Sequence, residues 1–219
     1  MKNKKWLLLL IIAFPSAFWL ILETSTINSR KLPYYGPKKS LKAGDTSYFV
    51  SSSKFYRGDS AKALEPTELD TTTYPIYALI FLNKKYRGDA YRLTGLWEYL
   101  NYKQSKIEHI PFILVSQSNN GTSATQQELE KLQASKNVHF YTWPEKSYDS
   151  LTYGYFKEKP YYIDYSFFML IDRQRHIRGY YDGRYVSEIK RLIDEYQHLR
   201  LKEEKQKLLK VNEIKQDTL

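Results

Sequence analysis

Few side chains in this chain could do chemistry. The sequence contains no cysteine, which excludes disulfides, thiolate nucleophiles, dithiol redox pairs and cysteine-ligated metals within it. Met169 lies inside an apolar run, where a thioether is typical core filler. The histidines lack the short spacing of a metal-binding pair, so we expect packed or surface side chains rather than ligands. They are His109, His139, His176 and His198.

Two aspartates near the C-terminal apolar segments are the remaining candidates for acid and base chemistry. Asp172 and Asp182 flank a predicted hairpin turn and its exit, where aspartate typically forms local hydrogen bonds. The sequence also lacks a glycine-rich phosphate loop, a serine-nucleophile motif and a carboxylate cluster. No catalytic constellation is visible, and we predict that the protein is not an enzyme and has no catalytic, cofactor or metal residues.

The charge of the chain is strongly basic, with a formal net charge of +10 at pH 7. Much of the excess lies near the N-terminus, outside the predicted folded part, and no recognised nucleic-acid module accompanies it. We therefore expect no nucleic-acid partner. The basic residues concerned are Lys2, Lys4, Lys5, Arg30, Lys31, Lys38, Lys39 and Lys42.

The N-terminus predicts a membrane segment. Residues 6–22 form an almost unbroken apolar run directly after three lysines, and no small-x-small cleavage motif follows it. We assign 1–23 to an uncleaved transmembrane anchor, with a cleaved signal peptide as the alternative. The flanking lysines favour a cytoplasmic N-terminus, with the remainder on the outer, periplasmic side of the cytoplasmic membrane. Residues 24–45 are polar and broken by Pro and Gly, which predicts a tether.

A folded domain is predicted over 46–200, because apolar runs typical of strands alternate with helical periodicity. Asp89 is a candidate helix cap, and Thr125 with Glu128 forms a capping box. In chain order we expect a leading hairpin of two short strands at 48–50 and 54–56, a loop with a turn of helix at 59–73, a central strand at 76–82, a helix over 93–100, a strand at 109–115, a helix that starts at this capping box and includes Leu129 and Leu132, a short strand at 138–141, and a helix at 148–155.

The C-terminal block carries the clearest pattern. The runs 167–172 and 176–181 predict a β-hairpin, and the apolar spacing over 189–199 predicts a helix packed on it. Alternating strands and helices followed by a hairpin indicate an α/β fold, a mixed sheet with helices on both faces. Residues 201–219 predict a charged, solvated helical tail, with a short coiled coil or partner helix as the alternative.

Three phrases of this layout resemble the SCO/SenC family of membrane-anchored thioredoxin-fold proteins. They are KLPYYGPK at residues 31–38, FMLIDRQRHIRGYYDG at 168–183 and SEIKRLIDEY at 187–196. The resemblance covers roughly 31–199. It implies a thioredoxin-like fold and a copper-handling or thiol-redox protein that serves cytochrome c oxidase assembly on the outer side of a cytoplasmic membrane.

The chemistry of that family uses a Cys-x-x-x-Cys pair in the loop after the first central strand, and a histidine just before the final hairpin. Two thiolates and an imidazole suit Cu(I), and the dithiol can also form a disulfide. Copper is therefore the cofactor that the resemblance implies, but the corresponding positions in this chain hold none of these ligands. The emptied site is the candidate partner surface: Asn83, Lys84, Lys85, Tyr86, Arg87, Asp89, Asp164 and Tyr165.

The leading hypothesis is an exported, membrane-anchored SCO/SenC-like protein that has lost its metal and redox chemistry and works by binding. Its protein partner would be an oxidase subunit or a metal-binding homologue. A second hypothesis is a copper chaperone with unconventional ligands, such as histidines or carboxylates. A third is an envelope structural or interaction protein with no link to respiration.

Overall fold

The computed structural model describes residues 15, 32–40, 46–57, 65–70, 72–82, 93–117, 136–162 and 167–216. The chain divides into two compact units, Met1–Lys31 and Leu32–Leu219, and all described residues except Pro15 belong to the second. The predicted anchor at 1–23 lies outside the described residues apart from Pro15. Among the helices of the described part, none combines the length and the apolar character that a membrane span requires.

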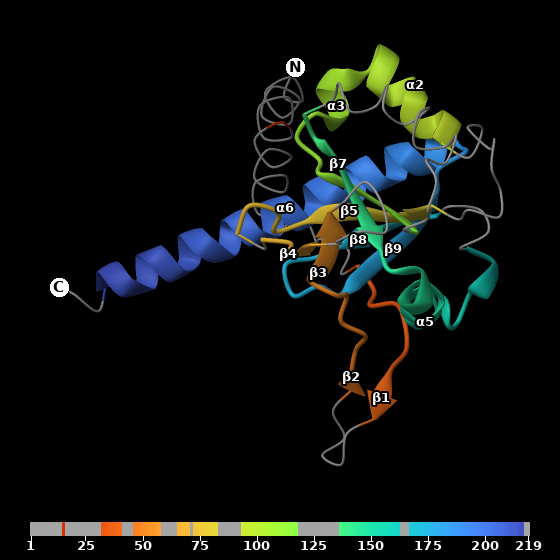
Figure 1. The fold of residues 1–219 in the computed structure, drawn as a ribbon. Helices are drawn as coiled ribbons and strands as arrows, with labels where there is room; N and C mark the ends of the chain where they lie inside the picture. The colour runs from red at the N-terminus through yellow and green to blue at the C-terminus, as the bar shows by residue number, and fades with distance from the viewer. Residues whose placement is uncertain are drawn as a thin grey trace, which may run out of the picture. The chain divides into compact units, whose positions relative to one another are not determined.

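The described strands form a mixed seven-stranded sheet in the order β4-β3-β7-β6-β5-β8-β9 (Figure 1). The three central strands β5, β6 and β7 are parallel, and antiparallel strands flank them on both sides. The prediction of a mixed α/β sheet is thus confirmed. The strand bounds are β3 Lys54–Arg57, β4 Glu65–Glu68, β5 Tyr77–Leu82, β6 Phe112–Gln117, β7 Val138–Trp143, β8 Phe167–Ile171 and β9 Ile177–Asp182.

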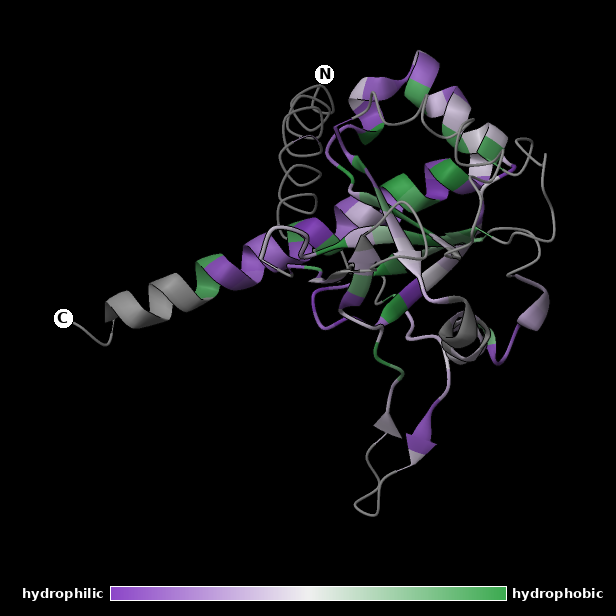
Figure 2. Ribbon diagram, viewed as in Figure 1, coloured by the Kyte–Doolittle hydropathy of each residue, from purple (hydrophilic) through white to green (hydrophobic). Residues whose placement is uncertain are grey.

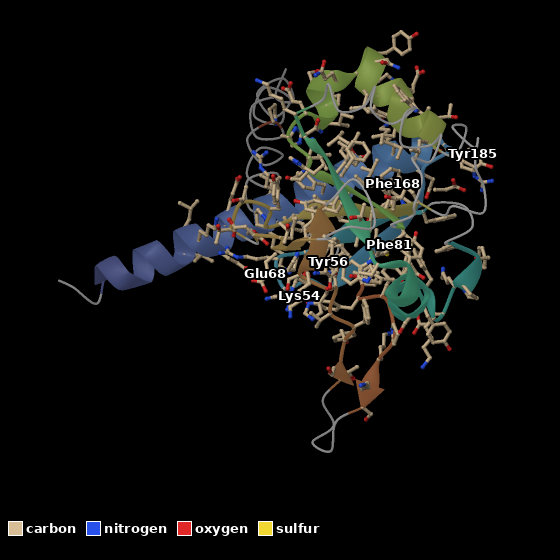
Figure 3. All side chains as sticks on the ribbon, in the orientation of Figure 1. Lys54, Tyr56, Glu68, Phe81, Phe168 and Tyr185 are labelled. Atoms are coloured by element: carbon tan, nitrogen blue, oxygen red, sulfur yellow. The ribbon has the colours of Figure 1, made fainter. Side chains whose placement is uncertain are left out.

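Helices cover both faces of the sheet because the central strands are apolar on both sides. In β5, Ala78 and Ile80 face one core cluster, whereas Leu79 and Phe81 face the other. Phe168 of β8 belongs to the first cluster, opposite to Phe81 (Figure 3). Helices α2 and α6 pack in the first cluster, and α5 packs in the second. The helix bounds are α2 Thr94–Tyr102, α3 Gln104–Ile107, α5 Glu145–Phe156, the 3-10 helix η4 Pro160–Tyr162 and α6 Val186–Gln216.

The predicted leading hairpin is wrong. Strand β3 pairs with β4 and β7, while Val50 forms an isolated bridge with His176 at the other end of the sheet. Strand β4 falls in a segment that the sequence predicts as a loop because no sustained apolar period runs through it, and the strand contains Pro66. Proline is tolerated on an edge strand, and β4 is the edge of this sheet. Lys54 and Glu68 face each other across this pair (Figure 3).

Part of the predicted tether belongs to the folded unit. Leu32 packs against one core cluster, Tyr35 packs against the other, and Gly36 is buried. The surrounding sequence is polar and contains Pro and Gly, so its pattern does not indicate these contacts. Beyond them lies a small two-stranded antiparallel sheet, β1 Lys39–Ser40 with β2 Thr46–Ser47.

The start of α2 also differs from the sequence expectation. Its N-cap is Leu93, which makes no side-chain capping hydrogen bond, so Asp89 is not its cap. The apolar residues that predicted the helix are nevertheless on its buried side, including Leu96 and Leu100. The predicted capping box at Thr125 and Glu128 lies outside the described residues.

Helix α6 continues without a break through the predicted tail to Gln216. Its first half buries the stripe that the sequence predicts: Ile189, Leu192, Ile193, Tyr196 and Leu199. From Arg200 to Leu209 the helix is largely exposed and hydrophilic (Figure 2), and Leu201, Leu208 and Leu209 are more than half exposed.

Candidate functional site

In the sequence, the candidate partner surface follows one strand and precedes another, and these two strands are neighbours in the sheet. All eight predicted residues, from the 83–89 and 164–165 segments, are outside the described residues. Strand β5 ends at Leu82 and its antiparallel partner β8 begins at Phe167, with Ile80 opposite Phe168. The chain therefore leaves β5 and enters β8 at the same edge of the sheet. The described residues around this edge show what supports the site.

On the β5 side, Tyr148 of α5 holds the last residue of the strand. Its hydroxyl donates a hydrogen bond to the carbonyl oxygen of Leu82 at 3.0 Å, and its ring meets that of Phe81 edge-on at 5.9 Å. Tyr148 is only 1% exposed. The bond satisfies the carbonyl of a partly buried strand end, so Tyr148 fixes the position of Leu82, the last residue before the 83–89 segment.

Replacing Tyr148 by Phe tests this support. The variant keeps the ring but leaves the Leu82 carbonyl without this donor, so we expect the free energy of unfolding to fall by about 1–2 kcal/mol. Urea denaturation of the full chain measures it. Tyr153→Phe on the same helix is the matched control, because Tyr153 is 64% exposed and its loss should change little. Equal effects of the two substitutions would contradict the assignment.

On the β8 side, aromatic rings surround the strand entrance. Tyr162 stacks on Phe167 with ring centroids 3.9 Å apart, and Tyr180 meets Tyr162 at 5.2 Å. Lys159 donates a hydrogen bond to the Tyr162 hydroxyl at 3.0 Å, which raises the pKa of the lysine. Burial raises the pKa of Tyr180, which stays protonated and donates to the carbonyl oxygen of Tyr155. These groups offer stacking and hydrogen bonds and no soft metal ligand.

The histidines lie on separate elements, as the sequence predicts. His109 contacts Tyr196, His139 contacts Tyr74, and His176 contacts Tyr34, each through its ring. All four are partly exposed, and burial lowers the pKa of His109. Met169 is fully buried in β8. Within the described part of the chain, no group of three His, Cys, Asp or Glu side chains could hold a metal ion.

Asp172 and Asp182 have the local structural roles that the sequence predicts. Asp172 accepts from the backbone N–H of His176 at 2.9 Å and closes the β8–β9 turn. Asp182 accepts from the backbone N–H of Arg184 at 3.0 Å and from its guanidinium, at the exit of β9. Both carboxylates are thus engaged in local turn hydrogen bonds, as the sequence predicts.

The most highly connected polar residue in this region, Arg178 of β9, was not singled out from the sequence. It is 6% exposed and pairs with Asp172, whose carboxylate oxygen lies 3.0 Å from its Nη1. Its Nε donates to the carbonyl oxygen of Pro33 at 3.2 Å, Nη2 donates to that of Leu32, and the guanidinium lies 4.2 Å from the ring centre of Tyr34. An arginine at an otherwise apolar strand position is the signal that could have revealed it.

Arg178 therefore joins two of the phrases that carry the family resemblance. The LPYYG phrase lies against β9, where the Tyr35 N–H donates to the Ile177 carbonyl oxygen at 2.9 Å. The planar guanidinium satisfies both orphan carbonyls and a buried carboxylate at once, which lysine could not do. The phrases form one packed structural unit on β9.

The first glycine of the IRGYYDG phrase is explained by close approach. A Cβ at Gly179 would lie 2.2 Å from the Tyr181 hydroxyl oxygen, which itself donates to Glu195 of α6. Gly183 accepts a hydrogen bond from the Gly95 N–H at 2.9 Å, so the exit of β9 rests on the first turn of α2. Residues of the IRGYYDG phrase thus form structural contacts with the LPYYG phrase, with α2 and with α6.

No protein-family model matches the chain, and no curated protein matches it. Among solved structures, the chain is similar to a SCO1/SenC family lipoprotein from Bacillus anthracis str. Ames, at 13% identity and a TM-score of 0.45, over 78% of this chain and 98% of the other. It is also similar to a hypothetical protein from Sinorhizobium meliloti 1021, at 9% identity and a TM-score of 0.32, over 67% and 73% of the two chains. At these TM-scores the two likenesses carry no argument about what this chain does.

Proposed function

We propose that this chain is a membrane-anchored, exported SCO/SenC-like protein of thioredoxin-like fold, without copper or redox chemistry, which acts as a binding or assembly factor in respiratory oxidase biogenesis. It faces the outer side of the cytoplasmic membrane. Its partner is an oxidase subunit or a metal-binding homologue, which docks on the surface formed by the 83–89 and 164–165 segments.

One observation carries the proposal: two sequence phrases that resemble the family pack against each other in the fold, while the residues that would hold copper are absent. Arg178 of the IRGYYDG phrase binds the carbonyl oxygens of Leu32 and Pro33 in the LPYYG phrase. The sheet order, with three parallel central strands beside a terminal antiparallel hairpin, is compatible with a thioredoxin-like fold. The sequence has no cysteine to supply a thiolate or a disulfide.

Copper binding is the first test. We expect that the full chain does not take Cu(I) from a competing chelator, because thiolates are absent and the described histidines lie on separate elements. Titration against a colourimetric Cu(I) chelator measures this, with the His109→Ala and His176→Ala variants as comparisons. Tight one-to-one binding that either substitution abolishes would instead support a copper chaperone with unconventional ligands.

Capture of the partner is the second test. A photo-crosslinking amino acid at Lys84 or Asp164 in the full chain, expressed in its own cells, should capture an oxidase subunit or a copper-handling protein. The same group at Lys205, on the exposed part of α6, is the matched control and should not capture it. If both positions of the candidate surface capture only proteins unrelated to respiration, the assembly role is wrong and an envelope interaction protein is favoured.

A further inference from the structure

A pocket of about 720 Å³ lies between the β8–β9 turn and the outer half of α6, away from the strand edge where the candidate partner surface begins. Its size is in the range of small-molecule sites. The buried Leu199 and the ring of Tyr34 supply its apolar lining, and charged and amide side chains form the rest. The lining residues are Tyr34, Asp172, Arg173, Gln174, Arg178, Leu199, Lys202, Glu203, Gln206 and Lys207.

Two of the charged residues are part of the wall. Asp172 and Arg178 are each about 95% buried and are bound to each other, to the β8–β9 turn and to the carbonyl oxygens of Leu32 and Pro33. These contacts hold Asp172 and Arg178 in place, so this part of the pocket wall is rigid. The other charged side chains, which line the pocket from the turn and the helix, have no hydrogen bond or ion pair to another described residue: Arg173, Lys202, Glu203 and Lys207.

The charge of the pocket is unbalanced. Four cationic side chains line it against two carboxylates, so an excess of two positive charges remains when the Asp172–Arg178 pair is set aside. A phosphate monoester carries about −1.5 to −2 at pH 7 and presents three acceptor oxygens. Arginine binds such a group in a bidentate manner, and lysine binds it as a point charge.

We propose that this pocket binds a phosphate monoester, with the phosphate between Arg173, Lys202 and Lys207 and an apolar portion against Leu199 and Tyr34. The amides of Gln174 and Gln206 lie within the same lining and supply further donors. Free phosphate esters and the headgroup of phosphatidic acid share this chemistry. The proposal is independent of the assembly role, because none of its residues belongs to the candidate partner surface.

Glu203 gives the proposal its sharpest test. Glu203 lines the pocket together with Arg173 and Lys207; burial raises its pKa, the two cations lower it, and the nearby Asp172 carboxylate raises it further. An incoming phosphate meets repulsion from this carboxylate. Removing the charge at Glu203 should therefore strengthen binding, whereas removing a cation should weaken it. If the phosphate were attracted only non-specifically to a basic protein, substitutions at different positions of one helix would not have such different effects on its affinity.

The experiment uses the full chain in nanodiscs of phosphatidylcholine, with phenyl phosphate as the probe in isothermal titration calorimetry. We expect saturable one-to-one binding that Arg173→Gln and Lys207→Gln each weaken by about three- to tenfold. Glu203→Gln should tighten binding by a factor of about three or more. Lys205→Gln is the matched control, since Lys205 lies on the same stretch of helix but outside the pocket lining, and should change affinity less than about twofold.

A second arm separates the two sources of phosphate. Nanodiscs that also contain phosphatidic acid should block phenyl phosphate binding if the lipid headgroup reaches the pocket, and should leave it unchanged if the ligand is a free ester; both outcomes support the pocket. The absence of saturable phenyl phosphate binding would overturn the proposal. So would a loss at Lys205→Gln equal to that at Lys207→Gln, or weaker binding by the Glu203→Gln variant.

Discussion

Replacing Arg178 by Ala is expected to lower the free energy of unfolding by about 3–5 kcal/mol, because it leaves the buried carboxylate of Asp172 without its counter-charge. It also leaves the carbonyl oxygens of Leu32 and Pro33 without their donors, so residues 32–36 should lose hydrogen-exchange protection. Arg178→Lys should recover only part of the loss, since one ammonium cannot span a carboxylate and two carbonyls. Urea denaturation and hydrogen exchange of the full chain measure both effects.

Two comparisons keep this prediction specific. Arg200→Ala removes an exposed pair with Glu204 on α6 and should cost no more than about 0.5 kcal/mol. The double variant Asp172→Asn with Arg178→Met removes the buried charges together and should cost less than the sum of the two single changes. A loss below about 1 kcal/mol in Arg178→Ala would refute the central role of this residue.

Replacing Gly95 by Ala is expected to destabilise the protein by about 1–3 kcal/mol, although alanine is the better helix former by about 1 kcal/mol. A Cβ at this position would lie 2.8 Å from the backbone carbonyl of Tyr185 and 2.9 Å from the carbonyl oxygen of Gly183. These are backbone atoms at the exit of β9, so neither side can move without displacing α2 from the start of α6. Thermal and urea unfolding measure the change.

Gly154→Ala in α5 is the matched control. There the added Cβ would meet only the ring of Phe49, at 3.2 Å, and a half-buried ring can shift by a few tenths of an ångström. We expect the steric cost and the gain in helix propensity to cancel to within about 1 kcal/mol. A Gly95→Ala variant as stable as the parent chain would show that the contact between α2 and the β9 exit is loose.

The elements with strong periodicity could be predicted from the sequence because local patterns reflect their burial. The run YALIFL is apolar at every position, since both faces of β5 are covered, and it was predicted as a central strand. The spacing of Ile189, Leu192 and Ile193 follows directly from one buried helix face. The turn roles of Asp172 and Asp182 were equally local and were predicted correctly.

The remaining features depend on contacts between residues that are far apart in the chain. The central strands, the terminal hairpin and helix, and the lack of thiolate ligands could be predicted, because each is set by composition or by neighbours within a few residues. Long-range contacts, in contrast, place Pro66 in an edge strand, pack the LPYYG phrase on β9 and bring Arg173 and Lys207 to one pocket. Each of these is a pairing across the fold, such as Arg178 with Pro33 at a separation of 145 residues, and no local propensity encodes a partner so distant.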